Sequence, residues 1–268
     1  MIEAMKFWVR KFGIDGFRCD LAFWVPLAFW KEAISELNQL KQLFWLAESD
    51  ALDHPEYMEV FDAAYTWTWM HQTLDWKKNA RPLSHLRSVL DRYESAPGIP
   101  AWFTSNHDEN SWNGTEYEKY GAAALPLAVH SCTWPGLPLI YSGQELPNHK
   151  RLLFFDKDEI AWKKNCELQG FYKNLLDLRA SNAALDLRAP VFPLHTSANE
   201  CVLAYLRKNG KDEVLVALNL SSRGVRTELT DQWVKASYRD IFTGSRFDFA
   251  AERRLELSAW GYLVLVRQ

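Results

Sequence analysis

Three acidic residues in this chain each come at the end of a short apolar run, and together they could cleave a glycosidic bond. These residues are Asp20, Glu48 and Asp108. If the runs are parallel strands, their carboxyl ends meet at one edge of a sheet, where enzymes of this architecture place their active sites. Glycosidic cleavage uses a pair of carboxylic acids, and a third can stabilise the charge that develops in the transition state. We therefore treat the three residues as candidate catalytic acids.

The first candidate, Asp20, has a cation two positions before it. Residues 16–20 read GFRCD, and side chains alternate between the two faces of a strand, so Arg18 and Asp20 share a face. A fixed cation beside Asp20 would lower the pKa of its carboxyl and keep it ionised, as a nucleophile for an anomeric carbon must be. A plain ion pair between a strand and its loop would explain this segment equally well.

The second candidate, Glu48, follows the apolar residues Phe44, Trp45 and Leu46. Desolvation by such neighbours would raise the pKa of its carboxyl, and a protonated carboxyl is what a general acid needs. Because a serine and an aspartate follow directly, a helix cap or an ion pair is the alternative interpretation, and this segment considered alone favours that alternative.

The third candidate belongs to the sequence Asn106-His107-Asp108. His107 and Asp108 could hold sugar hydroxyls through hydrogen bonds that tighten in an oxocarbenium-like transition state. No second histidine or aspartate stands at metal-ligand spacing, so we expect no metal at this site.

Composition indicates a globular protein without a nucleic-acid or membrane surface. The chain has 268 residues and a formal net charge of −3 at pH 7, which suits one large domain plus a small one and indicates no basic surface. No apolar run is long enough to span a bilayer. No secretion signal is visible, but one could precede residue 1, so the sequence leaves the compartment open.

Aromatic and cysteine residues add two further expectations. Tryptophan is unusually frequent, at 13 residues, and sugar rings stack on exposed aromatic faces, although most of these side chains are expected in the core. The better carbohydrate-stacking candidates lie near predicted strand ends: Trp24, Trp67, Trp69, Trp112 and Trp134. The four cysteines show neither metal-ligand spacing nor a disulfide framework.

The elements that must position these residues alternate between strand and helix. Strands are predicted at 14–20, 43–48, 60–66, 101–105 and 137–141. Helices are predicted at 1–12, 26–41, 82–94, 116–132 and 165–181. This alternation predicts parallel βαβ units.

The pattern changes after about residue 182 to short β-rich runs. Asn209-Gly210 between two of these runs is a strong hairpin signal. We predict a catalytic domain at 1–184 and a small antiparallel β-sandwich domain at 185–268.

Together these segments resemble the α-amylase family, glycoside hydrolase family thirteen. Residues 16–20 resemble its G-F-R-x-D nucleophile segment, 46–48 its acid/base segment, and 103–108 its F-x-x-N-H-D segment. Residues 135–145, PGLPLIYSGQE, resemble its last barrel strand with the following loop, and 154–162 are also typical. Single matches are weak, but four in the family's order are specific, and the resemblance covers nearly the whole chain.

The resemblance implies a role for each candidate. Asp20 would be the nucleophile, Glu48 the general acid/base and Asp108 the transition-state stabiliser of a double displacement that retains the α configuration. This mechanism requires the two reacting carboxyls about 5–5.5 Å apart. The substrate-binding residues would be Arg18, which supports the nucleophile, His107, which contacts the sugar at the cleaved bond, and Asn106.

The resemblance also implies an incomplete barrel. The predicted strands correspond to the fourth to eighth of a TIM (β/α)8 barrel, so the expected fold is α/β with a partial barrel. An open sheet exposes edges and apolar surface, so we expect the chain to form a homo-oligomer or to need an N-terminal segment that completes the barrel. The chemistry needs no cofactor, although the family commonly holds a structural calcium ion.

Three functions fit this resemblance. The leading one is an α-glucan or α-glucoside hydrolase whose substrates are α-glucans or maltooligosaccharides. The second is a transglycosylase or isomerase on α-glucosides, in which a sugar rather than water reaches the intermediate. The third is a non-catalytic, amylase-like binding or assembly protein: the three intact acids argue against it, whereas the missing barrel strands argue for it.

Overall fold

The computed structural model describes residues 1–268 and divides into two compact units. The first comprises Met1–His71 and Ser88–Ala101, and the second comprises Gln72–Arg87 and Trp102–Gln268. The predicted boundary near residue 184 marks instead a change of architecture inside the second unit, and it stays a prediction as a domain limit.

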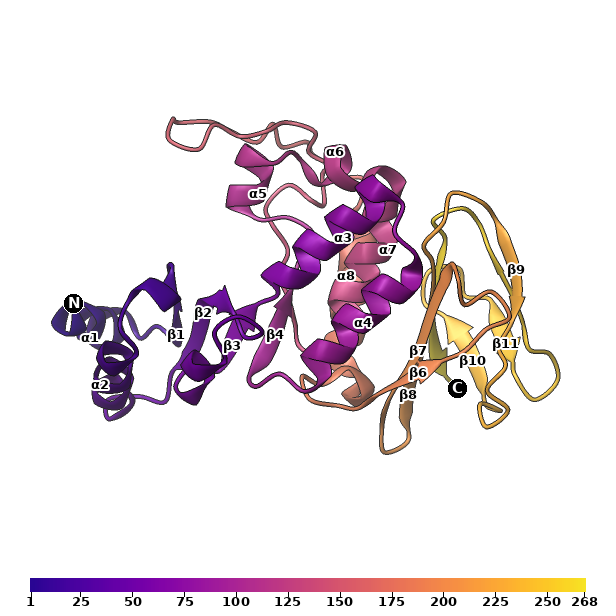
Figure 1. The fold of residues 1–268 in the computed structure, drawn as a ribbon, viewed down its shortest axis with the longest axis horizontal. Coiled ribbons are helices and arrows are strands. Elements are labelled where there is room, and N and C mark those ends of the chain that lie inside the picture. The colour runs from indigo at the N-terminus through magenta and orange to yellow at the C-terminus, as the bar shows by residue number, and fades with distance from the viewer. The chain divides into compact units, whose positions relative to one another are not determined.

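A five-stranded sheet follows the chain in simple order, β1-β2-β3-β4-β5. Its strands are β1 (Gly16–Cys19), β2 (Phe44–Asp50), β3 (Ala63–Tyr65), β4 (Ile99–Trp102) and β5 (Leu137–Pro138). The pairings from β1 to β4 are parallel, with an α-helix between β1 and β2 and two between β3 and β4 (Figure 1). The predicted α/β fold with part of a barrel sheet is confirmed. Strand β4 ends earlier than predicted because the following residues turn into the cap of a helix.

Helices of the first unit cover its part of the sheet with an apolar face. Helix α1 (Ile2–Phe12) ends at Gly13, whose φ of 66° lets its N–H bond the Val9 carbonyl at 3.0 Å. Helix α2 (Leu27–Asn38) buries residues at helical spacing: Trp30, Ala33, Ile34 and Leu37. Short 3₁₀ turns lie at Ala22–Trp24 (η1) and Pro55–Glu59 (η2).

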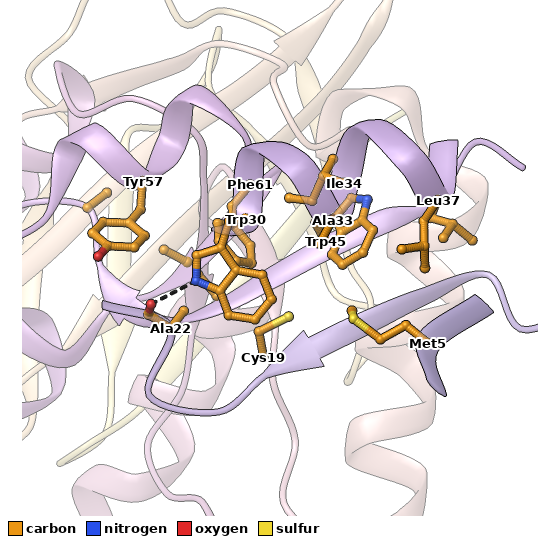
Figure 2. Packing of buried hydrophobic residues seen from close by; sticks show 14 of the residues in the cluster. Met5, Cys19, Ala22, Trp30, Ala33, Ile34, Leu37, Trp45, Tyr57 and Phe61 are labelled. Carbon is orange, nitrogen blue, oxygen red and sulfur yellow. Dashed lines mark hydrogen bonds between the residues drawn. The ribbon is translucent and has the colours of Figure 1, made fainter. Parts of the chain in front are cut away.

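Figure 2 shows the resulting core between these helices and the first strands. Trp30 and Trp45 are its largest buried rings, and Trp30 donates its indole N–H to the Ala22 carbonyl at 2.9 Å. A buried indole satisfied in this way stabilises the turn that directly follows the candidate nucleophile.

The remaining helices are α3 (Trp67–Asn79), α4 (Leu83–Glu94), α5 (His107–Trp112), α6 (Glu116–Tyr120), α7 (Ala124–Thr133) and α8 (Gln169–Ser181). Two more 3₁₀ turns are η3 (Gly121–Ala123) and η4 (Ala183–Leu185). The single helix predicted over 116–132 is wrong: it breaks at Gly121, where φ is 55° and ψ is −131°. No helix has the length and apolar character needed to cross a membrane.

The C-terminal region is antiparallel, as predicted. One sheet has the order β11-β10-β13-β8-β7-β6, and a second pairs β12 with β9. The strands are β6 (Val191–Leu194), β7 (Val202–Asn209), β8 (Asp212–Asn219), β9 (Val225–Glu228), β10 (Ser237–Asp240), β11 (Arg246–Asp248), β12 (Arg254–Leu257) and β13 (Tyr262–Arg267). The predicted hairpin is confirmed, since Asn209 pairs with Asp212 and Gly210 has a φ of 59°.

Candidate active site

The first two candidate acids meet on one guanidinium group. Strands β1 and β2 pair in parallel with Arg18 opposite Leu46, so both strand ends lie side by side. Arg18 Nη1 lies 2.6 Å from Asp20 Oδ1, and Arg18 Nη2 lies 3.0 Å from Glu48 Oε1. The predicted contact between Arg18 and Asp20 is present, and the same cation also holds Glu48, which the sequence did not indicate. The contact with Asp20 is a charge-assisted hydrogen bond, whereas the contact with Glu48 is an ion pair without hydrogen-bond geometry.

The two acids differ sharply in their exposure. The side chain of Asp20 is 75% exposed, whereas that of Glu48 is 7% exposed. The pairing of β2 with β3 shifts register between Ala47 and Asp50, and the residues from Ala47 to Asp50 are all buried instead of alternating. A β-bulge of this kind re-aims side chains beside a site, and here it accompanies the burial of Glu48.

A sharp turn after Asp20 supplies a second partner for Glu48. Leu21 has a φ of 39°, in the left-handed region that residues other than glycine rarely adopt. Its backbone N–H donates to Glu48 Oε2 at 2.7 Å. Burial disfavours the carboxylate form of Glu48, while Arg18 and this N–H favour it. The raised pKa expected for Glu48 therefore stays a prediction.

Tyr65, at the end of β3, completes the setting of Arg18. Arg18 Nε donates to the Tyr65 hydroxyl at 3.3 Å, and the guanidinium carbon lies 5.5 Å from the tyrosine ring centroid. Burial opposes the charged guanidinium, but the contacts with Tyr65, Asp20 and Glu48 outweigh it and raise the pKa of Arg18. Sequence analysis missed Tyr65, although it ends a strand next to the one that carries Glu48.

The helix-capping role that was considered for Glu48 is filled by Asp50 instead. Asp50 Oδ2 accepts from the Thr68 backbone N–H at 2.7 Å, in the first turn of α3, and from the Tyr93 hydroxyl at 2.5 Å. Asp50 Oδ1 accepts from the Leu52 N–H at 2.9 Å. Asp50 therefore accepts hydrogen bonds from backbone N–H groups, whereas Glu48 lines a neighbouring groove.

That groove has a volume of about 250 Å³ and lies within the first unit. Phe23 and His54 stack there with ring centroids 4.6 Å apart and planes 12° from parallel. Its lining residues are Leu21, Phe23, Glu48, Ser49, Asp50, Asp53, His54 and Trp67. Aromatic walls with a few convergent polar groups are typical of small-molecule sites.

The third candidate segment lies in the second unit, at the start of α5. Asn106 is buried and caps this helix, its side-chain oxygen accepting from the Glu109 N–H at 2.8 Å. His107 and Asp108 follow on the more open side, with His107 Nε2 3.5 Å from Asp108 Oδ2. Substrate contacts by Asn106, His107 and Asp108 stay predictions, and the structure adds a capping role for Asn106.

Two sets of buried contacts support this segment: an ion pair between α5 and α6, and hydrogen bonds to the Thr104 hydroxyl. Glu109 pairs with Lys119 at 2.9 Å, which ties α5 to α6, and burial lowers the pKa of Lys119. Glu116 accepts a hydrogen bond from the Thr104 hydroxyl, and burial raises the pKa of the Glu116 carboxyl. Gln144 donates to the same hydroxyl at 3.1 Å. Sequence analysis missed all of these groups, since nothing local distinguishes them from surface charges.

The stacking candidates divide by exposure. Trp24 and Trp112 are exposed and Trp67 is half-buried, but Trp69 and Trp134 are buried in the core and do not offer a free face. No group of three or more histidine, cysteine, aspartate or glutamate side chains is placed to hold a metal ion, and all four cysteines are free thiols. The structural calcium that the family commonly holds was not assigned to any residue of this chain, and its presence stays untested.

Comparisons with known proteins agree with this architecture. The profile of the maltogenic amylase C-terminal domain matches residues 193–264. An α-amylase, MalA, from Haloarcula japonica is 28% identical over 83% of this chain and 33% of its own length. A 4-α-glucanotransferase from Thermotoga neapolitana is 28% identical over 63% of this chain and 41% of its own length.

Among solved structures, a maltogenic α-amylase, AmyB, from Thermotoga neapolitana superposes with a TM-score of 0.85 at 22% identity, covering all of this chain and 64% of that one. The chain thus spans less than half the length of the curated relatives named above. Its parallel sheet, followed by an antiparallel β domain, therefore has the fold of a partial amylase barrel with its C-terminal β domain. In sequence the chain is similar to α-amylases, and its residues 193–264 match the C-terminal domain of maltogenic amylases.

Proposed function

We propose that this chain carries the catalytic acids of a retaining glycoside hydrolase that acts on α-glucans or maltooligosaccharides. The observation that carries the proposal is the shared contact of Arg18 with Asp20 and Glu48, at 2.6 and 3.0 Å. Two carboxyls held on neighbouring nitrogens of one guanidinium are close enough to flank a single glycosidic bond. The amylases among the relatives support the choice of substrate class.

In this proposal the different surroundings of the two acids give them different tasks. Asp20 is open to solvent and paired with a permanent cation, so it is the ionised nucleophile that attacks the anomeric carbon. Glu48 is buried beside the groove and is the general acid that protonates the leaving oxygen. Glu48 then removes a proton from water, whose oxygen displaces Asp20 from the glycosyl intermediate.

The proposal also gives roles to Asp108 and His107, which were predicted from the sequence. Asp108 would stabilise the oxocarbenium-like transition state through the sugar hydroxyls, and His107 would contact the same sugar. The start of α5 holds both residues through the buried cap at Asn106 and the ion pair between Glu109 and Lys119.

The test is release of reducing sugar from maltooligosaccharides by the purified protein, beside an Asp20→Asn variant. Turnover by the parent and its loss in the variant would support the proposal, and NMR of the first product would show whether the α configuration is retained. Equal turnover in both proteins would reject Asp20 as the nucleophile. Absence of turnover in both would reject hydrolysis as the activity of this chain.

A transglycosylase is the second candidate, and the match to a 4-α-glucanotransferase supports it. The same acids would serve, with a sugar hydroxyl rather than water accepting the glycosyl group. Incubation with maltotriose separates the two: glucose and maltose alone indicate hydrolysis, whereas products longer than the substrate indicate transfer.

A further inference from the structure

A second groove lies in the C-terminal β domain, among the strands drawn in orange to yellow in Figure 1. It has a volume of about 320 Å³ and includes none of the candidate active-site residues. Its lining residues are Lys208, Glu213, Trp233, Val234, Lys235, Ala236, Tyr238 and Arg267. The groove therefore combines an indole ring with several cationic side chains.

Trp233 is the apolar wall of this groove. Its side chain is 53% exposed, so much of the indole is accessible from solvent. Phe192 on β6, itself partly exposed, meets it edge to face with ring centroids 6.3 Å apart. The two rings form an aromatic platform beside the groove.

The loop that carries Trp233 is held rigidly by Arg253. This guanidinium donates to the carbonyl oxygens of Leu229 and Val234, each at 2.8 Å, and also to that of Asp231. The Val234 side chain is buried next to Trp233 in the chain, which anchors the loop from its other side. A loop backbone held in place in advance lowers the conformational entropy that is lost when a ligand binds.

The floor of the groove presents hydrogen-bond donors fixed by a buried acid. Glu213 forms an ion pair with Lys208 at 2.7 Å, and it accepts hydrogen bonds from Arg267 at 2.9 Å and from the Tyr238 hydroxyl at 2.7 Å. Lysine has three N–H donors and arginine five, so each cation keeps donors beyond the one used here. Their side chains are 43% and 42% exposed, which leaves those donors accessible.

We propose that this groove binds an α-glucan chain as a second carbohydrate site. The apolar C–H face of a glucose ring would stack on Trp233, and its hydroxyl oxygens would accept from Lys208 and Arg267. The three cations Lys208, Lys235 and Arg267 would also attract an anion, since the groove has only one acid. A small anion, however, would gain nothing from contact with the aromatic platform. The choice of α-glucan rests on the proposed function, whereas the groove itself does not.

The test is affinity electrophoresis through gels that contain amylopectin, in the Asp20→Asn background so that the polymer is not cut. We expect the polymer to retard the parent, and Trp233→Ala to weaken that binding about tenfold, the loss expected for one aromatic stacking contact. Trp8→Ala is the matched control, because Trp8 is 50% exposed on α1 and lies outside the groove. It should leave retardation unchanged.

Lys235→Met provides a second variant that removes a groove donor without touching the aromatic platform, and we expect it to weaken retardation less than Trp233→Ala. Retardation should persist at about 0.5 M NaCl, which screens attraction to an anion. Equal retardation of Trp233→Ala and its parent, loss of retardation in salt, or no retardation at all would overturn the proposal.

Failure of this proposal and of the proposed function are separable. Hydrolysis of maltooligosaccharide without retardation that depends on Trp233 would reject the groove alone. Retardation that depends on Trp233 without any hydrolysis by the parent with Asp20 intact would reject the function and leave the groove as a glucan site.

Discussion

Two ion clusters in this molecule are built in opposite ways. At the ends of β1 and β2 one cation, Arg18, is shared by two acids, whereas in the C-terminal domain one acid, Glu213, is shared by two cations. The first cluster keeps an excess of negative charge, which a proton or a developing cation can relieve. In the second cluster Glu213 has three partners, and Lys208 and Arg267 keep N–H donors that Glu213 does not use. The difference separates a cluster suited to chemistry from one suited to recognition.

The largest effect is expected where the first cluster loses its buried acid. Glu48→Gln should lower kcat by about 10²–10⁴-fold, the usual contribution of general acid catalysis. A substrate with a good leaving group, such as an α-glucosyl fluoride, needs no proton and should still form the glycosyl intermediate. Steady-state kinetics on maltotriose and on the fluoride provide the comparison, and an equal loss of the first step on both would argue against an acid role.

A smaller loss is expected when the shared cation changes shape. Arg18→Lys keeps the charge, but a single ammonium cannot bridge Asp20 and Glu48 as the planar guanidinium does, so kcat/KM should fall by about 10–100-fold. The pH–rate profile should shift as well, because the balance of charge on both acids changes. A profile that superposes on that of the parent would show that Arg18 has only a packing role.

Breaking the second cluster should affect stability. Glu213→Gln leaves Lys208 and Arg267 without their acid, and the free energy of unfolding at neutral pH should fall by about 1–3 kcal/mol, the cost of losing a buried partner. Burial raises the pKa of Glu213, but hydrogen bonds and ion pairs with Lys208, Tyr238 and Arg267 outweigh it and lower the pKa.

The sign of the pH dependence follows from that lowered pKa. Stability contributed by Glu213 is present above the pKa of the unfolded chain and is lost as pH falls through the folded pKa. The difference between Glu213→Gln and the parent should therefore be full at pH 7 and shrink in acid. Urea unfolding across this range measures it, and a difference independent of pH would mean that ionisation of Glu213 is not involved.

The smallest effect concerns Glu116, a buried acid that accepts a hydrogen bond from the Thr104 hydroxyl. Burial raises the pKa of Glu116, so its stability contribution is full below the unfolded pKa and is lost as pH rises through the folded value. Glu116→Gln should therefore raise the melting temperature at neutral pH by a few degrees, about 1 kcal/mol, with little change in acid. A lower melting temperature at pH 7 would show that the charged form is needed.

The sequence was sufficient to predict the alternation of strands and helices, because apolar spacing is local information. Strands β6, β9 and β11 were not predicted because they are short and largely exposed, which weakens the alternating pattern. Helix α3 was not predicted because its tryptophans were considered as sugar-stacking candidates rather than as a buried face.

Part of the site could be predicted for the same reason. Arg18 lies on β1 and Asp20 directly follows its last residue, so their contact follows from the two-residue spacing of side chains on one face. The contacts of Arg18 with Glu48 and Tyr65 depend on the bulge in β2 and on the pairing of three strands. The positive φ of Leu21, which aims an N–H at Glu48, has no local signature because leucine rarely adopts it.

Arg253 contacts the loop around Trp233 only through main-chain carbonyl oxygens. Because every residue type supplies such an oxygen, the shape of the loop does not depend on which exposed side chain it carries. The residue at position 233 can therefore be exchanged. A different exposed side chain there would change what the groove recognises, while the backbone would stay in place. This separation of shape from chemistry makes the loop a suitable place to graft a new binding preference onto the β domain.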